Sequence, residues 1–248
     1  MFDVSGKRIL VTGASSGIGA HFARVLASGG AEVILAARRE DRIKDIAADI
    51  CAGGGTARSL VLDVADPGSI EKLAGTIEVL DVLINCAGLG REARALDQTD
   101  EDWDIVIDTN LKGAFLVARW AGRVMRDSGR GGSIVNIASI LGLRQAGGVL
   151  SYTVSKAGLI QMTKTMALEL ARFNIRVNAL APGYIKTELN NAFWETPAGK
   201  AMIARMPMRR LGELADLDGP LLLLASDASR FMTGSVIVAD GGHLVSSL

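Results

Sequence analysis

A serine, a tyrosine and a lysine in the second half of the chain have the spacing of a proton-transfer device. Tyr152 and Lys156 are four residues apart, so on a helix they share one face. A phenol with its ordinary pKa near ~10 transfers protons poorly at neutral pH, and a neighbouring ammonium lowers that pKa. Ser139 precedes Tyr152 by one short segment and could hold the oxygen of a substrate. Together the three side chains could add a proton to an alcohol oxygen or remove one.

A glycine-rich turn near the start of the chain offers a site for a redox cofactor. The sequence TGASSGIG covers residues 12–19 and separates an apolar strand pattern from a helical pattern. Glycines at such a turn let backbone N–H groups approach a pyrophosphate, and the helix N-terminus attracts the anion. The spacing G-x3-G-x-G differs from the common G-x-G-x-x-G fingerprint, so a purely structural turn is the alternative. We predict a dinucleotide site that includes Gly13, Ser15, Ser16, Gly17, Ile18 and Gly19.

The end of the second predicted strand indicates which dinucleotide binds. NAD sites usually place an acidic residue there, about 20 residues after the glycines. This strand ends in Ala36 and Ala37 and is followed by Arg38 and Arg39. Because a guanidinium pairs with a phosphate through a forked contact, we predict that Arg38 binds a 2′-phosphate and that NADP(H) is preferred over NAD(H). The alternative is that both arginines, and Arg39 in particular, are solvated charges at the start of a helix.

Short apolar runs alternate with longer helical patterns along the whole chain. Runs that are apolar on both faces are typical of parallel strands covered by helices on either side. The alternation predicts one α/β domain over residues 1–248, a Rossmann-type doubly wound parallel sheet of about seven strands with helices on both faces. The predicted strands are 8–12, 32–37, 59–64, 79–85, 133–139, 175–181 and 236–240. The predicted helices are 17–28, 39–51, 68–77, 100–127, 152–172 and 213–225.

Composition and charge argue against several other classes of protein. The 27 basic residues balance the 27 acidic ones, so no excess of positive charge indicates nucleic-acid binding. The two cysteines form no C-x-x-C pair and the two histidines lie far apart, so we predict no metal site. No apolar run approaches the ~18 residues of a membrane span, and the first residues lead directly into a strand pattern. We therefore expect a cytoplasmic protein that has no signal peptide and binds no membrane.

Several motifs in a fixed order resemble the short-chain dehydrogenase/reductase family along essentially the whole chain. The turn TGASSGIG resembles the cofactor turn of that family, and Ser139, Tyr152 and Lys156 match its catalytic residues in both spacings. NCAG at residues 85–88 resembles the family's N-N-A-G motif but has Cys86 at the second position. The resemblance implies further cofactor contacts at Asp63, Val64, Asn85, Ala87, Gly88, Tyr152, Lys156, Pro182, Gly183, Ile185 and Thr187.

The same resemblance implies a catalytic tetrad and an assembly. Tyr152 would be the general acid in reduction and the base in oxidation, and Lys156 would lower its pKa and bind the nicotinamide ribose. Ser139 would hydrogen-bond the carbonyl or alcohol oxygen, and Asn110 in DTNLKGAF would hold a water that links Lys156 to bulk proton donors. The hydride would belong to the cofactor. Helices 100–127 and 152–172 pair across a subunit interface in the family, which implies a homotetramer or, failing that, a dimer.

The sequence defines the substrate only broadly. Residues 183–212 form a long connection after the sixth predicted strand, and such connections often act as substrate-binding lids. Apolar residues in this segment predict a pocket for a medium-sized ketone or alcohol, with Ser139 and Tyr152 at the reacting oxygen. The other predicted substrate contacts are Leu141, Gln145, Tyr184, Leu189 and Phe193.

Three alternatives to a general ketone reductase stay open. Basic side chains in the same segment could receive a phosphopantetheine-borne chain, which would indicate a 3-oxoacyl-thioester reductase acting on acyl carrier protein or coenzyme A. A sugar or polyol dehydrogenase finds few polar side chains there. A dinucleotide-binding sensor without turnover is the third, although Tyr152 and Lys156 are both present. The basic residues in question are Lys186, Arg205, Arg209 and Arg210.

Overall fold

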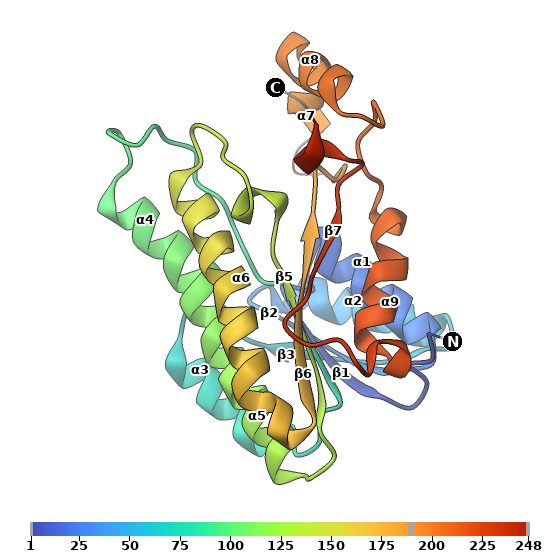
Figure 1. The fold of residues 1–248 in the computed structure, drawn as a ribbon. Coiled ribbons are helices and arrows are strands. Elements are labelled where there is room, and N and C mark those ends of the chain that lie inside the picture. The colour runs from blue at the N-terminus through green and yellow to red at the C-terminus, as the bar shows by residue number, and fades with distance from the viewer. Residues whose placement is uncertain (1, 188–190, 247–248) are drawn as a thin grey trace.

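The computed structural model describes residues 2–187 and 191–246, and it contains a parallel sheet between two layers of helices (Figure 1). Within these residues, seven parallel strands are arranged in the order β3-β2-β1-β4-β5-β6-β7. The chain winds outward from β1 to β3, returns to β4 beside β1, and then winds toward the other edge. The predicted doubly wound Rossmann-type fold is confirmed. The carboxyl ends of β1 and β4 meet where the winding reverses, which is where such sheets bind ligands.

The strands follow the apolar runs of the sequence, with shifts at some ends. β3 begins and ends three residues earlier than predicted, because its ladder with β2 starts at the pair Glu32 and Thr56. β4 begins three residues later than predicted. The bounds are Arg8–Thr12 for β1, Glu32–Ala37 for β2, Thr56–Val61 for β3, Val82–Asn85 for β4, Gly132–Ile137 for β5, Ile175–Pro182 for β6 and Val236–Ala239 for β7.

Helices cover both faces of the sheet (Figure 1). α1, α2 and α9 lie on one face, and α3, α5 and α6 lie on the other. No helix among the described residues is both long and apolar enough to cross a membrane. The bounds are Gly17–Ser28 for α1, Glu40–Ala52 for α2, Pro67–Glu71 for α3, Asp100–Ile107 for α4, Ala114–Asp127 for α5, Leu150–Leu170 for α6, Asn191–Trp194 for α7, Pro197–Arg205 for α8 and Asp218–Ala225 for α9.

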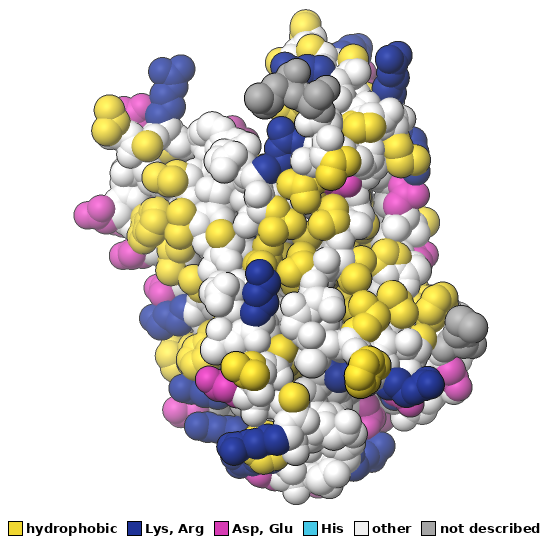
Figure 2. Space-filling view, viewed as in Figure 1, with side chains coloured by type: hydrophobic (Ala, Val, Ile, Leu, Met, Phe, Trp, Pro, Cys, Tyr) yellow, Lys and Arg dark blue, Asp and Glu magenta, His cyan; other side chains and the backbone are white. Residues whose placement is uncertain are grey.

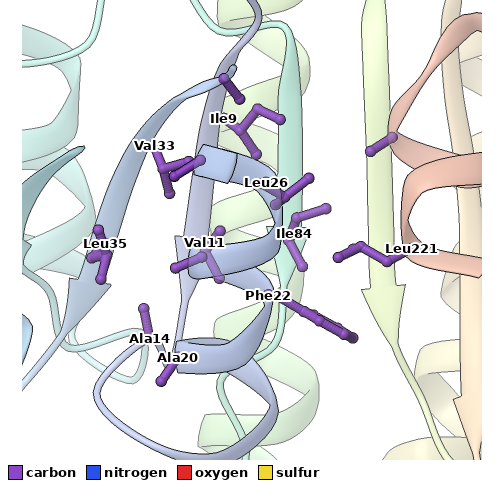
Figure 3. Packing of buried hydrophobic residues seen from close by; sticks show 14 of the residues in the cluster. Ile9, Val11, Ala14, Ala20, Phe22, Leu26, Val33, Leu35, Ile84 and Leu221 are labelled. Carbon is purple, nitrogen blue, oxygen red and sulfur yellow. The ribbon is translucent and has the colours of Figure 1, made fainter. Parts of the chain in front are cut away.

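Alternate residues of β1 fill two hydrophobic cores. Ile9 and Val11 belong to the core under α1, whereas Leu10 belongs to the core on the opposite face. Phe22 and Leu26 of α1 are fully buried in the first of these cores (Figure 3). Full burial of a large apolar side chain stabilises a fold by about 1.5–3 kcal/mol. The two cores therefore hold β1 and α1 firmly, and the glycine-rich turn between them has a defined shape.

The predicted helix 100–127 is wrong in one respect, because it is interrupted. Asp108–Gly113 forms a π-helical segment between α4 and α5, and this segment contains Asn110. A Cβ at Gly113 would lie 2.7 Å from the carbonyl oxygen of Val64, so the segment packs tightly against the loop after β3. One extra residue per turn is rare in helices and is common at functional sites.

The segment after β6 is not a plain loop. It carries the short helices α7 and α8, which project beyond the carboxyl ends of the strands (Figure 1). A β-bridge between Ile185 and Gly212 joins the two ends of the segment. Leu189, one of the predicted substrate contacts, lies outside the described residues. The helices are thus held above the sheet edge at which a ligand would bind.

Candidate active site

Strand β5 and helix α6 bring the three expected side chains to one place. Ser139 follows the end of β5, and Tyr152 and Lys156 lie one turn apart on α6. Ser139 is 7% exposed and Lys156 is 5% exposed, so both polar groups are largely removed from water. Ser139 lies close enough to Tyr152 for its hydroxyl to lower the pKa of the phenol. The spacing seen in the sequence therefore corresponds to a cluster in space.

Lys156 is a buried cation held by a backbone carbonyl. Its Nζ donates a 2.8 Å hydrogen bond to the carbonyl oxygen of Ile137, the last residue of β5. The same nitrogen lies 5.6 Å from the centre of the Tyr152 ring. Gly142 lets the loop after Ser139 pack on α6, since a Cβ there would lie 2.7 Å from the carbonyl carbon of Lys156. Lys156 thus joins β5 to α6 beside the phenol ring.

Burial favours the neutral forms of both Lys156 and Tyr152. It lowers the pKa of Lys156 to about 8, because an ammonium is disfavoured away from water. Burial also raises the pKa of Tyr152, although the hydroxyl of Ser139 lowers it in part. The ammonium of Lys156 is expected to lower the pKa of Tyr152, and in this structure burial dominates, so that the pKa of the phenol is raised overall. Burial outweighs the other effects there, and Nζ binds the Ile137 carbonyl rather than the phenol.

Asn110 is fully buried in the π-helical segment and holds the loop that follows β4. Its Oδ1 accepts a 2.8 Å hydrogen bond from the N–H of Leu89, and its Nδ2 donates to the Leu89 carbonyl at 2.8 Å and to Ser155 Oγ at 3.1 Å. Gly88 lies next to this amide. A Cβ at Gly88 would lie 3.3 Å from Asn110 Oδ1 and 3.5 Å from Lys156 Nζ. The glycine therefore keeps the region between the amide and the ammonium clear of a side chain.

The glycine-rich turn packs too closely for side chains at two of its glycines. Gly13 has a φ of +68°, and a Cβ there would lie 2.8 Å from the Cα of Ala87. A Cβ at Gly19 would lie 2.4 Å from the carbonyl oxygen of Gly13. Ser16 is the N-cap residue of α1, and its side chain makes no capping hydrogen bond among the residues described. The first N–H groups of α1 can therefore receive an anion, which fits the pyrophosphate of a dinucleotide.

Asn85, one of the predicted cofactor contacts, has its side chain occupied by the protein itself. Its Nδ2 donates to the Ala114 carbonyl at 2.7 Å and to Asn136 Oδ1 at 3.2 Å, and its Oδ1 accepts from Thr12 Oγ1 at 3.4 Å. Thr12 Oγ1 also accepts a 3.1 Å hydrogen bond from the N–H of Ala87. This buried network fixes the carboxyl ends of β1, β4 and β5 relative to one another.

The predicted pair Asp63 and Val64 forms the loop after β3. Asp63 Oδ1 accepts a 3.0 Å hydrogen bond from the N–H of Ala65, and the Asp63 N–H donates to Ser69 Oγ at 3.1 Å. Val64 is 5% exposed and packs behind the π-helical segment at Gly113. The loop is therefore rigid and lies near the end of β2, where an adenosine would be expected.

Arg39, rather than Arg38, reaches the glycine-rich turn. Its guanidinium donates to Ser15 Oγ at 2.9 and 3.1 Å and to Ser16 Oγ at 2.6 Å. Arg38 is exposed and makes no side-chain hydrogen bond within the described part of the chain. The alternative that Arg39 is only a solvated charge at the start of a helix does not hold, because its side chain folds back from the start of α2 onto the turn. Both arginines stand at the carboxyl end of β2.

A cavity of about 290 Å³ opens beside Ser139 and Tyr152. Its walls come from the loop after β5, the start of α6, the start of α1 and the segment after β6. Two predicted substrate contacts do not line it: Gln145 is exposed on the loop before α6, and Phe193 is 43% exposed and packs on Trp194. The predicted residues that do line it are Ile18, Ser139, Leu141, Tyr152, Pro182, Gly183, Tyr184, Ile185 and Thr187.

Arg144 and His243 lie near this cavity and were not predicted to do so. The ring of Tyr184, which lines the cavity, lies 5.3 Å from the ring of His243 and 5.2 Å from that of Trp194. Arg144 donates a hydrogen bond through Nη1 to the carbonyl oxygen of His243. The position of Arg144 shortly after Ser139 was an available signal. No local sequence pattern predicts the position of His243, because its contacts with Tyr184 and Arg144 depend on how β7 is placed in the sheet.

Known proteins similar to this chain identify its family. A family model described as enoyl-(acyl carrier protein) reductase matches residues 13–243. A 3-oxoacyl-(acyl carrier protein) reductase of Thermotoga maritima is 39% identical over 246 residues, which cover 98% of this chain and 99% of that protein. This chain belongs to the short-chain dehydrogenase/reductase family.

Other similar members of this family act on sugars and sugar acids. The L-rhamnose 1-dehydrogenase (NAD(P)(+)) of Azotobacter vinelandii is 39% identical over 250 residues, covering 96% of this chain and 97% of that one. A solved gluconate 5-dehydrogenase from Burkholderia cenocepacia, in complex with NADP and tartrate, has a TM-score of 0.94 and 33% identity and covers 99% of this chain and 98% of its own. As a short-chain dehydrogenase/reductase, this chain is an oxidoreductase acting on CH–OH or carbonyl groups. NADP is bound in several of the similar structures.

The burial of Lys156 predicts a rise in stability with pH. Its pKa is about 8 in the folded protein against 10.5 when free, so between these values the unfolded chain binds the additional proton. The free energy of unfolding should therefore increase with pH across this window, by up to about 3 kcal/mol. Burial also raises the pKa of the Cys86 thiol to about 12, which lowers stability as pH rises through the same range, so the effect of Lys156 is read as the difference between parent and variant. Urea denaturation at pH 8 and pH 10 should show a more positive change in the free energy of unfolding in the parent protein than in Lys156→Met. Lys164→Met, which alters an exposed lysine on the same helix, is the control and should match the parent. An equal change in the parent and in Lys156→Met would contradict the assignment.

Proposed function

We propose that this protein is an NADP(H)-preferring oxidoreductase that interconverts a ketone and a secondary alcohol, with Tyr152 as proton donor and acceptor. The observation that carries the proposal is one cavity shared by Ser139, Tyr152 and the segment that begins at Pro182. The glycine-rich turn ends at the same edge of the sheet and can hold the pyrophosphate. A bound nicotinamide would supply or accept the hydride, and the residues of the chain would bind, orient and move the proton.

The state of Tyr152 suits a proton donor for reduction. Burial raises its pKa, so the phenol keeps its proton at neutral pH until an acceptor oxygen is present. Ser139 would fix the carbonyl oxygen of the substrate next to the phenol. As the proton leaves, negative charge develops on Tyr152, and the Lys156 ammonium close to the ring stabilises it. In the oxidative direction the same phenolate would accept the proton of the alcohol.

Lys156 and Asn110 would then return a proton to Tyr152. Gly88 leaves the region between the Asn110 amide and the Lys156 ammonium clear of a side chain, where a water could connect them. A lysine with a pKa of about 8 can gain and lose a proton near neutral pH. In this proposal Asn110 is a positioning residue, since its amide is bound to Leu89 and Ser155.

The preference for NADP(H) is supported by the cationic end of β2. An adenosine at the carboxyl end of β2 would place its 2′-phosphate near Arg38 and Arg39, and no acidic residue follows the strand before Glu40. Arg39 already lies against Ser15 and Ser16 of the phosphate-binding turn. Arg38 is exposed and can turn toward the same phosphate. The other proposed cofactor contacts are those predicted from the sequence. Asn85 would contribute indirectly, because its side chain fixes the carboxyl ends of β1, β4 and β5.

Two narrower substrates are supported by specific observations. The similar acyl carrier protein reductase and the basic side chains after β6 favour a 3-oxoacyl-thioester reductase. The similar rhamnose and gluconate dehydrogenases favour a sugar or sugar-acid dehydrogenase. A sensor without turnover is disfavoured by the intact cluster of Ser139, Tyr152 and Lys156.

We further propose that residues 183–212 act as a substrate lid and that the protein is a cytoplasmic homotetramer or, failing that, a dimer. Phe115 on α5 is 38% exposed and Leu168 on α6 is 81% exposed, so the outer surface of these two helices carries apolar side chains. A cavity of about 290 Å³ at the same helices has both apolar and charged lining residues, namely Phe115, Met166, Leu170 and Phe173 together with Arg119, Arg123, Arg126 and Glu169. A second copy of the chain would cover this surface.

Replacing the phenol tests the proton donor directly. Tyr152→Phe removes the ionisable hydroxyl and keeps the ring, so we expect kcat to fall by roughly two orders of magnitude or more. Binding of NADPH, measured by fluorescence titration, should change little. Turnover is measured as NADPH oxidation over a panel of ketones, acetoacetyl thioesters and sugars. Near-normal kcat in this variant would exclude Tyr152 as the acid.

Replacing the two arginines tests the cofactor preference. Arg38→Gln and Arg39→Gln each remove a cation from the end of β2, so kcat/KM for NADPH should fall by about tenfold or more and kcat/KM for NADH should change little. Lys44→Gln, which alters an exposed cation on α2, is the matched control and should leave both values near those of the parent. A parent protein that already prefers NADH would refute the assignment.

A further inference from the structure

Arg144 stands on the same loop as Ser139 and is tied to it. A 3-10 turn at Ile140–Gly142 follows Ser139, and the N–H of Arg144 donates a 2.9 Å hydrogen bond to the Ile140 carbonyl. The Arg144 side chain crosses to the C-terminal segment, where it binds the carbonyl oxygen of His243. The guanidinium is therefore held at a fixed place relative to the reacting groups.

The guanidinium of Arg144 has more donors than described partners. An arginine has five N–H donors, and the hydrogen bond to the His243 carbonyl occupies one of those on Nη1. No Asp or Glu in the described part of the chain lies within ion-pair distance of it. The nearby carboxylate of Asp240 is bound by backbone N–H groups of Gly242 and Leu244, at 2.8 and 2.6 Å. The charge of Arg144 is thus not matched by an anion of those residues.

Tyr184 connects Arg144 to the catalytic cavity. Its ring lines the cavity with Ser139 and Tyr152 and stacks at 5.3 Å from the ring of His243, whose carbonyl Arg144 holds. Arg144 is close enough to lower the pKa of the Tyr184 phenol, against the effect of burial. Arg144 does not itself line the cavity, so a substrate with its oxygen at Ser139 and Tyr152 would reach the guanidinium by extending past Tyr184.

The surroundings of His243 favour a negative charge. Burial lowers the pKa of His243, Arg144 and Arg205 lower it further, and Asp240 opposes them. Trp194 packs on Tyr184, and its buried Nε1–H has no acceptor among the described residues. A buried donor without an acceptor is costly, and an anionic oxygen would satisfy it. Figure 2 shows a hollow between two parts of the molecule, one formed by α7 and α8 and the other next to α4. Lys and Arg side chains lie at its rim.

We propose that Arg144 binds an anionic group of the substrate, at the end of the molecule remote from the reacting carbonyl. This assignment rests on the proposed function, since it places the carbonyl between Ser139 and Tyr152. A guanidinium binds a carboxylate or a phosphate oxygen pair through a forked contact, so the substrate is an oxo acid or a phosphate-bearing oxo compound. A neutral ketone lacks this contact and should be the poorer substrate.

The test compares charged substrates with neutral partners of nearly the same shape. Acetoacetate and levulinate are each paired with their methyl esters, and acetoacetyl-coenzyme A is paired with the N-acetylcysteamine thioester, which lacks phosphate. The parent should favour the charged member of one pair, and Arg144→Gln should lower kcat/KM for that member by about tenfold to one hundredfold, mainly through KM. The neutral member should stay within about threefold. The pair that responds identifies the anion as carboxylate or phosphate.

Two further variants separate recognition from a structural effect. Arg144→Lys keeps the charge and should restore part of the preference for the anion. Arg58→Gln is the matched control. Among the described residues, Arg58 also donates only to a backbone carbonyl, that of Thr76 at 3.5 Å, but it lies on β3 at the edge of the sheet. This variant should leave both members of every pair unchanged. An equal loss for charged and neutral substrates in Arg144→Gln would overturn the proposal.

The outcomes also distinguish this inference from the proposed function. Turnover of the neutral ketones without any preference for the anions would refute the anion site and leave the oxidoreductase assignment intact. If the parent turned over none of these compounds, calorimetric titration of the NADP⁺-bound protein with tartrate and with dimethyl tartrate would decide the question. Binding of tartrate that is lost in Arg144→Gln supports the anion site, and equal binding by both proteins refutes it.

Discussion

The buried charge of Lys156 is the constraint on which the rest of the site depends. An ammonium that is 5% exposed needs a partner, and the carbonyl at the end of β5 provides it at 2.8 Å. This bond fixes α6 against the sheet. Tyr152, one helical turn before Lys156, is thereby placed next to Ser139. The same bond also explains two glycines, since Gly142 lets the loop pack on the lysine backbone and Gly88 leaves the space next to the ammonium clear of a side chain. One hydrogen bond thus aligns a strand, a helix and two loops.

Much of this arrangement could be predicted from the sequence because it depends on local spacing. The alternation of apolar runs fixes the order of strands and helices, and the four-residue spacing of Tyr152 and Lys156 fixes their shared face. The interruption at Asp108–Gly113 could not be predicted, because the apolar pattern of a helix continues through a π-helical turn. Which of the two arginines contacts the glycine-rich turn could not be predicted either, since it depends on which side chain folds back to Ser15. Such contacts join segments that are distant in the sequence.

The chemistry and the choice of substrate come from different parts of the fold. The proton-transfer groups stand on β5, α6 and the π-helical segment, which the sheet holds rigidly. The candidate specificity groups come from the segment after β6 and from the end of the chain, where Tyr184, Trp194 and His243 stack together. Arg144 links the two parts because it follows Ser139 and binds the His243 carbonyl. This division suits a family whose similar members act on acyl thioesters, sugars and sugar acids.

A crystal structure of the protein with NADP⁺ would test the central claim most directly. We expect the pyrophosphate to lie on the turn between Gly13 and Gly19 and the 2′-phosphate to lie within hydrogen-bond distance of Arg38 or Arg39. We also expect the nicotinamide ring to enter the cavity beside Ser139 and Tyr152, with its ribose within hydrogen-bond distance of Lys156. A nicotinamide ring bound outside that cavity would contradict the account.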